Sequence, residues 1–267
     1  MSKFSEEHYD YLKKKKAKKI VVLACQILIA FVFIFTWELL SKYNVINSFI
    51  FSSPSLAIKT ILNLHNSNNL YPHILTTTTE ILIAFALSSL IGFLVATLLW
   101  WYNTFAKIVD PYLTMLNSLP KVALGPIIII WGGTNIKAII IMALLISLII
   151  SIINIYEGFM NVDGNRIKLL KSFKATKLQI FFRCILPSSM INILNALKIN
   201  ISMSLIGVIM GEFLVSKSGI GYLIIYGSQV FNLNLVIAGI CILAILSIIL
   251  YYLISYLEKK IIKNIRV

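Results

Sequence analysis

The sequence predicts an all-α, polytopic membrane protein with six transmembrane helices. The first observation is composition: 59% of the 267 residues are hydrophobic, only 13% are charged, and the mean hydropathy is +0.90. The second is a set of apolar runs long enough to cross a bilayer, which takes about 20 helical residues. The third is a bias of Lys and Arg toward alternate connections. Because a span must close its backbone hydrogen bonds internally, each run is expected to be a helix.

Six apolar segments are the predicted spans, and four of them contain no Asp, Glu, Lys or Arg. The third is interrupted by Pro120, Lys121 and Pro126, so a kink is expected there. The fifth contains Lys198 and Glu212. The first is longer than the apolar region of a signal peptide, and no small-residue cleavage site follows it, so an uncleaved anchor is predicted. In order, the segments are Ile20–Trp37, Ile81–Tyr102, Tyr112–Trp131, Ala138–Tyr156, Ile185–Val215 and Leu235–Leu257.

Lys and Arg lie mostly on one side of these spans: 18 are on the side of the two termini and only four are on the other. Because cytoplasmic connections are enriched in Lys and Arg, both termini and the connection between spans four and five are expected in the cytoplasm. This topology accounts for the net charge of +14 without a nucleic-acid partner. The predicted division is a basic cytoplasmic segment 1–19, a six-span domain 20–257 with a cytoplasmic loop 161–187, and a basic tail 258–267.

The longest connection on the opposite side is Ser41–Thr79. Within it, Ser53 and Pro54 are residue types typical of a helix N-cap and of the first helical position. A short helix is therefore expected over SPSLAIKTILNL, lying along the outer surface.

The connection between spans four and five contains the basic, amphipathic stretch KSFKATKLQIFFRCILP, Lys171 to Pro187. One short helix is expected over Asn165–Phe173. Thr176 followed three residues later by Gln179 is a capping box, so a second helix is expected to begin there. Pro187 is expected to interrupt that helix near the membrane. The alternative to a functional loop is an amphipathic helix lying on anionic headgroups, which its basic charge favours.

The sequence contains no recognisable catalytic motif. It lacks the G-x-x-x-x-G-K-[ST] phosphate loop, H-E-x-x-H and G-x-S-x-G, and beyond the N-terminal Glu6, Glu7 and Asp10 no paired carboxylates lie within a few positions of each other. The three cysteines and three histidines are scattered and predict no metal site. We therefore expect no enzyme activity and no cofactor in this chain, and any ATP-driven activity requires a separate ATPase.

The stretch NVDGNRIKLLKSFKATKLQIFFRCILP resembles the cytoplasmic coupling loop of permease subunits of bacterial ABC importers. Three further stretches, FSSPS, Asp110–Gly133 and Gly211–Ile224, resemble the sulfonate, taurine and nitrate branch, and the resemblance runs in the same order from about residue 20 to 257. Four positions depart from the loop pattern: Lys168 stands for the family's Glu, Leu169 and Leu170 stand for its two alanines, and Lys174 stands for its Gly. The matching positions are Asn161, Val162, Asp163, Ala175, Gln179, Phe181, Leu186 and Pro187.

The resemblance implies the MetI-like architecture of type I ABC importers in a bacterial cell (inner) membrane. Two permease chains, expected here as a homodimer, would form the path. Two copies of an ATP-binding subunit, which uses ATP and Mg²⁺, would each hold one loop, and an external binding protein would deliver the solute. The expected ATPase-coupling residues are Asp163, Lys168, Leu170, Lys174, Ala175, Thr176, Gln179, Leu186 and Pro187.

Ionisable and helix-breaking residues inside the spans are candidates for the translocation path, because burying a charge in lipid costs about 2.5–3.5 kcal/mol. These candidates are Pro120, Lys121, Pro126, Lys198 and Glu212. Lys121 and Lys198 would attract an anion such as a sulfonate or nitrate. The alternative is that each lysine snorkels, or pairs with a neighbour such as Glu212. Small residues are expected at close helix contacts instead: Ser88, Ser89, Gly92, Ser202, Ser204 and Gly207.

Three alternative functions stay open at this point. The solute of an importer could instead be a vitamin precursor of the hydroxymethylpyrimidine or riboflavin type. A secondary transporter or channel would need its own coupling-ion site, and scattered single charges provide no clear one. A membrane-anchored scaffold would need no transport path at all.

Overall fold

The computed structural model describes residues 6–265, and this described part is entirely helical, with no β-strand. Residues 1–5 of the predicted basic segment and residues 266–267 of the predicted tail lie outside it. Five helical stretches of the described chain are long and apolar enough to cross a membrane. They are α1 (Glu6–Lys42), α4 (Leu70–Trp101), α7 (Ile136–Met160), the continuous helix formed by α9 (Lys177–Ile180), η2 (Phe181–Ile185) and α10 (Leu186–Val215), and α12 (Leu233–Ile265).

The predicted third span is a bent pair of helices. Its first part is α5 (Asn103–Ser118), and its second part comprises η1 (Lys121–Leu124) and α6 (Gly125–Gly132), at 86° to the first. The bend falls at Leu119, which is extended at φ −64° and ψ 139°, as expected for a residue before proline. The predicted kink is thus confirmed at Pro120, but it is a complete break. Pro126 does not kink a helix, because it lies in the first turn of α6, where no backbone N–H is needed.

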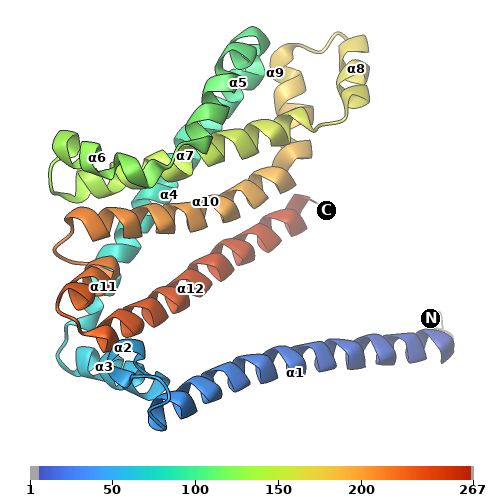
Figure 1. The fold of residues 1–267 in the computed structure, drawn as a ribbon. Helices are drawn as coiled ribbons and strands as arrows, with labels where there is room; N and C mark the ends of the chain where they lie inside the picture. Colours follow the sequence, from blue (N-terminus) through green and yellow to red (C-terminus); the bar gives the residue numbers. More distant parts are fainter. Residues whose placement is uncertain (1–5, 266–267) are drawn as a thin grey trace.

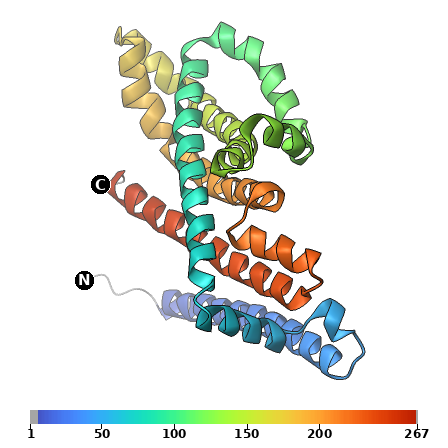
Figure 2. The same cartoon turned by 90° about the vertical axis from the view of Figure 1, so that its left-hand side faces the viewer.

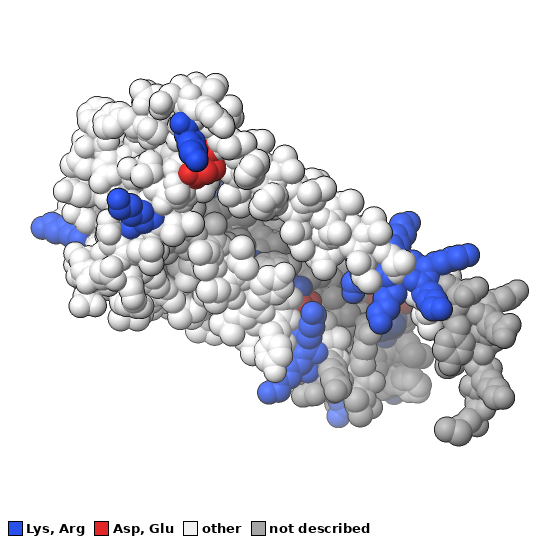
Figure 3. Space-filling view, turned by 90° about the horizontal axis from the view of Figure 1, so that it is seen from below, with Lys and Arg blue, Asp and Glu red and all other residues white. Residues whose placement is uncertain are grey.

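The two ends of the molecule carry different parts of the chain (Figure 1). The start of α1, the end of α12 and the helices α8 (Gly164–Ser172) and α9 lie at one end. The opposite end carries α2 (Ser48–Phe51), α3 (Pro54–Asn66) and α11 (Ile220–Gln229). On the face drawn in Figure 3, a broad uncharged surface separates the Lys and Arg near one end from those near the other. The predicted topology requires the start of α1, the end of α12 and the 161–187 loop to lie at the same end of the molecule, and they do.

The connection predicted for Ser41–Thr79 is shorter than expected. The short helix α3 is confirmed: Ser53 accepts a hydrogen bond from the N–H of Leu56 at 3.2 Å. However, α4 begins at Leu70, eleven residues before the predicted span. Its four consecutive threonines are helical, and the hydroxyls of two of them donate to carbonyls four residues earlier at 2.9 and 2.7 Å. These bonds within the helix satisfy the two hydroxyl groups. The low helix propensity of β-branched threonine therefore did not predict that the helix begins this early.

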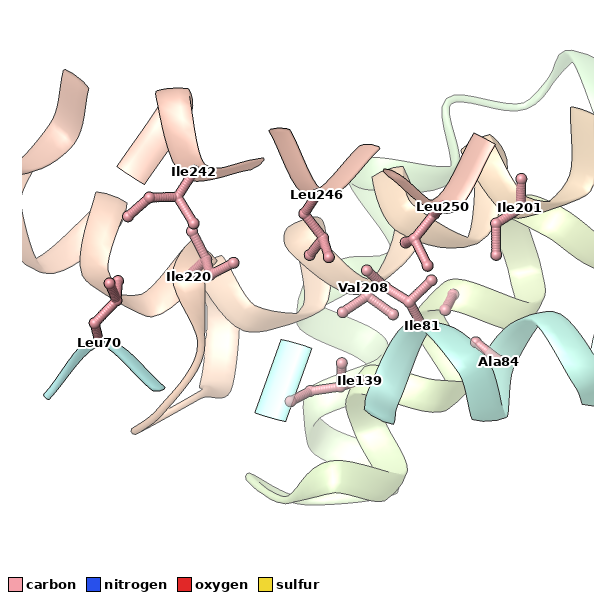
Figure 4. Packing of buried hydrophobic residues seen from close by; sticks show 11 residues of the cluster. Leu70, Ile81, Ala84, Ile139, Ile201, Val208, Ile220, Ile242, Leu246 and Leu250 are labelled. Atoms are coloured by element: carbon pink, nitrogen blue, oxygen red, sulfur yellow. The ribbon is translucent and has the colours of Figure 1, made fainter. Parts of the chain in front are cut away.

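The long helices α4, α7, α10 and α12 pack together around an aliphatic core. Figure 2 shows α4 upright and crossing the others, and Figure 4 shows Ile81, Val208 and Leu250 from three of these helices pointing toward one another. Small residues allow the closest approach, as predicted for Gly92 and Gly207. A Cβ on Gly207 would lie 2.5 Å from the Cα of Ala143 on α7. In membrane helices such close packing is a main source of stability.

A buried amide also joins two of these helices. Asn200 of α10 is fully buried, and its Nδ2 donates to the hydroxyls of Ser88 and Ser89 of α4 at 2.9 and 2.7 Å. Ser88 and Ser89 were predicted as packing residues, and the structure gives them this hydrogen-bonding role as well. The contribution of Asn200 was missed, since a single Asn in an apolar run does not show which neighbour it faces.

Helix α1 stands apart from the others and approaches them mainly through α2 and α3 (Figure 1). The carboxylate of Glu38 accepts hydrogen bonds from the backbone N–H and the hydroxyl of Ser55, at 3.0 and 2.8 Å, at the start of α3. Every residue from Tyr11 to Thr36 is exposed within the single chain. The apolar length of α1 is therefore available to lipid or to another protein.

Candidate functional site

The loop between α7 and α9 forms a helix–turn–helix unit, as predicted. Asp163 caps α8 by accepting a hydrogen bond from the N–H of Asn165 at 2.9 Å. At the other end of α8, the N–H of Lys174 donates to the carbonyl of Lys171 at 2.9 Å, and the N–H of Ala175 donates to that of Leu170 at 3.1 Å. These two bonds make a Schellman motif, in which the residue before the last donor has positive φ.

Lys174 occupies that left-handed position, with φ of 58°. Lys174 stands where the loops that this one resembles have Gly, the residue that adopts positive φ most easily. The structure keeps the turn, at a cost of about 1–2 kcal/mol for a residue with a Cβ. The loop geometry therefore tolerates the substitution.

The second helix begins at the predicted capping box. The N–H of Thr176 donates to Gln179 Oε1 at 2.8 Å, and the N–H of Gln179 donates to the Thr176 hydroxyl at 3.3 Å. The hydrogen-bond ladder changes next to Pro187, as expected, but the helix does not end there. A π-helical turn, Phe181–Ile185, connects α9 directly to α10, and the N–H of Leu186 bonds back to the carbonyl of Phe181. Pro187 lies in the first turn of α10, directly after the wider π-helical turn. The helix therefore continues although Pro187 has no N–H to donate.

An aromatic cluster at the ends of α4 and α7 holds this unit in place. The ring of Phe181 is buried, and its centroid lies 5.0 Å from that of Trp100, 6.3 Å from Trp101 and 5.6 Å from Phe159. The Nζ of Lys177 donates to the carbonyl of Trp101 at the C-terminus of α4 and lies over both indole rings, at 5.7 and 5.5 Å. A cation is favourable at a helix C-terminus and against aromatic faces.

The roles of Lys177, Trp100 and Trp101 in this cluster were missed. The sequence counted Lys177 only within the bias of Lys and Arg toward one side. One signal was present: three aromatics in a row, Trp100 to Tyr102, end the apolar run of α4. The sequence could not show what these aromatic residues contact. Trp101 bonds to Lys177 of α9, which lies 76 residues later in the chain.

The loop has an inward side and an outward side. Leu170 and Ala175, two of the expected coupling residues, are partly buried against the aromatic cluster, as are Ile167 and Leu186. The outward side instead carries Leu169, Phe173 and Leu178, with exposed fractions of 58%, 75% and 56%. Lys168, Lys171 and Lys174 are exposed beside them. We call these six residues the outward loop face.

Lys121 is engaged at the break in the third span. Its Nζ donates to the carbonyl of Asn117 at 2.9 Å, which is one of the carbonyls that the end of α5 leaves without a helical partner. The ammonium thereby stabilises the helix C-terminus at the bend. The lysine next to Pro120 is thus the hydrogen-bond partner of this carbonyl.

Lys198 of α10 forms an ion pair with Glu258 of α12. The suggested pairing with Glu212 is therefore wrong, and the reason is geometric. Lys198 and Glu212 are 14 residues apart on one helix, or about 21 Å at 1.5 Å per residue. Lys198 also borders a shallow hollow of about 480 Å³ that includes Asn195, Ser202 and Tyr251.

Glu212 is fully buried near the other end of α10. Its Oε1 accepts a 2.6 Å hydrogen bond from the hydroxyl of Thr77, and its Oε2 accepts one of 2.6 Å from the N–H of Gly221. Beside it lies Glu80 of α4, which was placed just before the second span and was not considered as a site residue. The predicted path residues thus occupy separate places: Lys121 lies at a bend, Lys198 on α10 pairs with α12, and Glu212 lies near the α10–α11 turn.

Residues 88–263 match the family model described as binding-protein-dependent transport system inner membrane component. The chain is 25% identical to the putative aliphatic sulfonates transport permease protein SsuC of Bacillus subtilis (strain 168), covering 95% of this chain and 92% of that one. It is 29% identical to the formylaminopyrimidine transport permease protein ThiX of Halalkalibacterium halodurans, covering 84% and 88%.

The fold is also similar to a solved structure. A chain of the MetNI methionine ABC transporter in an inward-facing conformation superposes with a TM-score of 0.59 at 18% identity, covering 72% of this chain and 96% of that one. At this identity the likeness concerns the fold, and it confirms the predicted MetI-like architecture.

Proposed function

This chain belongs to the family of binding-protein-dependent transport system inner membrane components, and from that premise we propose that it forms the translocation path of an ATP-driven importer for an aliphatic sulfonate, taurine or nitrate. The observation that carries the proposal is the family match over residues 88–263, which includes the outward loop face, the helices α7 and α10, nearly all of α12 and the C-terminal part of α4. The family is one of transport permeases, so the alternatives of a secondary transporter and of a scaffold are set aside.

Coupling to ATP hydrolysis is assigned to the loop 161–187. The outward loop face presents an apolar centre, Leu169 and Phe173, one helical turn apart, among three lysines. An apolar centre with a polar rim is the usual composition of a protein contact. We propose that the outward loop face binds in a groove of an ATP-binding subunit, and that acidic residues at the rim of this groove contact the three lysines. Two such subunits, which use ATP and Mg²⁺, would move two permease chains.

Movement of the loop would be passed to the spans through rigid contacts. Lys177 and Phe181 connect α9 to the ends of α4 and α7, and α9 continues through the π-helical turn into α10. A displacement of the outward loop face would therefore move α4, α7 and α10 together. The exposed apolar length of α1 supports a second permease chain as a neighbour, since α1 has little contact with its own bundle.

The solute class is tested by uptake. A strain that lacks this chain should lose ATP-dependent uptake of radiolabelled taurine, an alkanesulfonate or nitrate, and plasmid-borne wild type should restore it. The second candidate is a pyrimidine vitamin precursor, which the 29% identical formylaminopyrimidine permease favours. Loss of hydroxymethylpyrimidine uptake with unchanged sulfonate, taurine and nitrate uptake would reject the first class in favour of the second. Unchanged uptake of all four solutes would reject both.

The topology proposal places both termini and the loop in the cytoplasm. We expect Lys171→Cys, in a background with the three native cysteines changed to serine, to resist an impermeant thiol reagent in intact cells. Lys217→Cys is the matched control, because Lys217 is also exposed but lies at the opposite end, between α10 and α11. It should be labelled. Labelling of position 171 and protection of position 217 would invert the topology.

A further inference from the structure

Two buried carboxyl groups meet between α4 and α10. Glu80 is 2% exposed and Glu212 is fully buried, and their side chains lie within hydrogen-bonding contact of each other. Neither forms an ion pair with a Lys or Arg of the described chain, where the ion pair found is Lys198–Glu258. Their surroundings are aliphatic: the core residues Ile81, Ile139 and Ile220, labelled in Figure 4, come from the helices α4, α7 and α11 that pack there.

The partners of Glu212 favour its ionised form. It accepts from the Thr77 hydroxyl and from the N–H of Gly221, which lies in the first turn of α11. A helix N-terminus stabilises a negative charge through its free N–H groups and the helix dipole. Gly219, with φ of 116°, lets the chain approach closely, because a Cβ there would lie only 2.4 Å from the carboxylate carbon of Glu212.

Glu80 has the opposite environment. Its Oε2 is buried and has no hydrogen-bond partner among the described residues. A second carboxylate beside an ionised Glu212, in an aliphatic site, would be strongly unfavourable. A protonated carboxyl resolves both problems, because its O–H removes the charge and donates to Glu212.

We propose that Glu80 and Glu212 form a proton-binding site, in which a proton carried by Glu80 is shared with Glu212 and fastens α4 to the α10–α11 turn. The turn is held by further bonds to α4: the N–H of Ile220 donates to the Thr77 hydroxyl at 2.8 Å, and the N–H of Gly219 donates to His73 Nδ1 at 2.9 Å. Loss of the proton would place two negative charges in the site and separate α4 from α10. The inference is independent of the transported solute.

The other titratable groups near the site do not supply a compensating charge. On α4, His73 accepts a hydrogen bond at Nδ1, and its ring stacks on Tyr222 of α11 with centroids 6.0 Å apart. On the α10–α11 turn, Lys217 is exposed. The charged groups of α12 in the described chain lie at its far end, and Lys137 at the start of α7 is exposed.

The first test is infrared spectroscopy of the purified protein at neutral pH. Wild type should show the C=O stretch of a protonated carboxyl, and Glu80→Gln should lose it. Glu258→Gln is the matched control: it makes the same change at the glutamate that pairs with Lys198, and it should keep the band. A spectrum in which Glu80→Gln and wild type have the same protonated-carboxyl absorption would overturn the proposal.

The second test is thermal stability in detergent as a function of pH. Folding takes up a proton that an exposed glutamate does not hold at neutral pH, so wild-type stability should fall as pH rises, by at most about tenfold in the folding equilibrium per pH unit. Glu80→Gln keeps the shape and the donor without the titrating proton, so it should fold and lose this component of the pH dependence. Identical pH profiles for the two proteins, or failure of Glu80→Gln to fold, would also reject the site.

Discussion

Replacement of Phe173 by aspartate should abolish recovery of the ATP-binding subunit with this chain and abolish uptake, while leaving membrane insertion intact. Phe173 is 75% exposed at the end of α8, with Leu169 one turn earlier. Truncating a central aromatic anchor of a protein contact costs about 2–4 kcal/mol, or roughly 30- to 1,000-fold in affinity. The aspartate adds a charge without a partner in an acidic-rimmed groove. Co-purification from mild detergent, with the ATPase quantified by mass spectrometry, measures the effect.

The chain provides a matched control for that experiment. Phe49 in α2 is similarly exposed, at 65%, and lies at the opposite end of the molecule (Figure 1). Phe49→Asp should leave ATPase recovery unchanged. If Phe173→Asp also recovers the ATPase at the wild-type level, the coupling proposal is contradicted. That result would favour the alternative of a helix lying on anionic headgroups, because such a helix contributes nothing to ATPase binding. Leu170→Asp is unsuitable, since Leu170 packs inside the chain's own aromatic cluster.

Gly207→Val should prevent the transmembrane bundle from forming. The added Cβ would lie 2.5 Å from the Cα of Ala143, and a backbone atom cannot rotate away as a side chain can. Helices α7 and α10 would have to separate along their contact. Overpacking costs about 1–3 kcal/mol or more, and a cost of 3 kcal/mol lowers a folding equilibrium by more than about 100-fold. Size-exclusion chromatography of a fluorescent fusion should show aggregated or absent protein.

Gly164→Val makes the same chemical change where the structure has room. No atom lies within 4 Å of a Cβ at Gly164, the first residue of α8, so this variant should elute as wild type does. Gly207→Ala, which adds only the Cβ, should be intermediate. A symmetrical wild-type peak for Gly207→Val would mean that α7 and α10 are not in the close contact described here.

The sequence by itself was enough for the features that depend on one residue or on its near neighbours. The cost of transferring charge into lipid determines where spans lie, so the apolar runs predicted the long helices. The capping box at Thr176 and Gln179 and the N-cap at Ser53 were confirmed because they involve atoms three residues apart. The break at Pro120 follows from the missing N–H and from the extended residue that precedes a proline.

The tertiary structure decided the features that depend on which residues meet. Leu169 and Leu170 are the same residue type, and only the position of Phe181 and its neighbours determines that Leu170 is packed and Leu169 is exposed. Lys198 pairs with Glu258, 60 residues later, rather than with Glu212 on its own helix. Glu80 is opposite Glu212 only because α4 starts at Leu70 and crosses α10 at that level. A charge inside a membrane is satisfied by whatever the packing places beside it, and packing is a property of the helices together, not of any one of them.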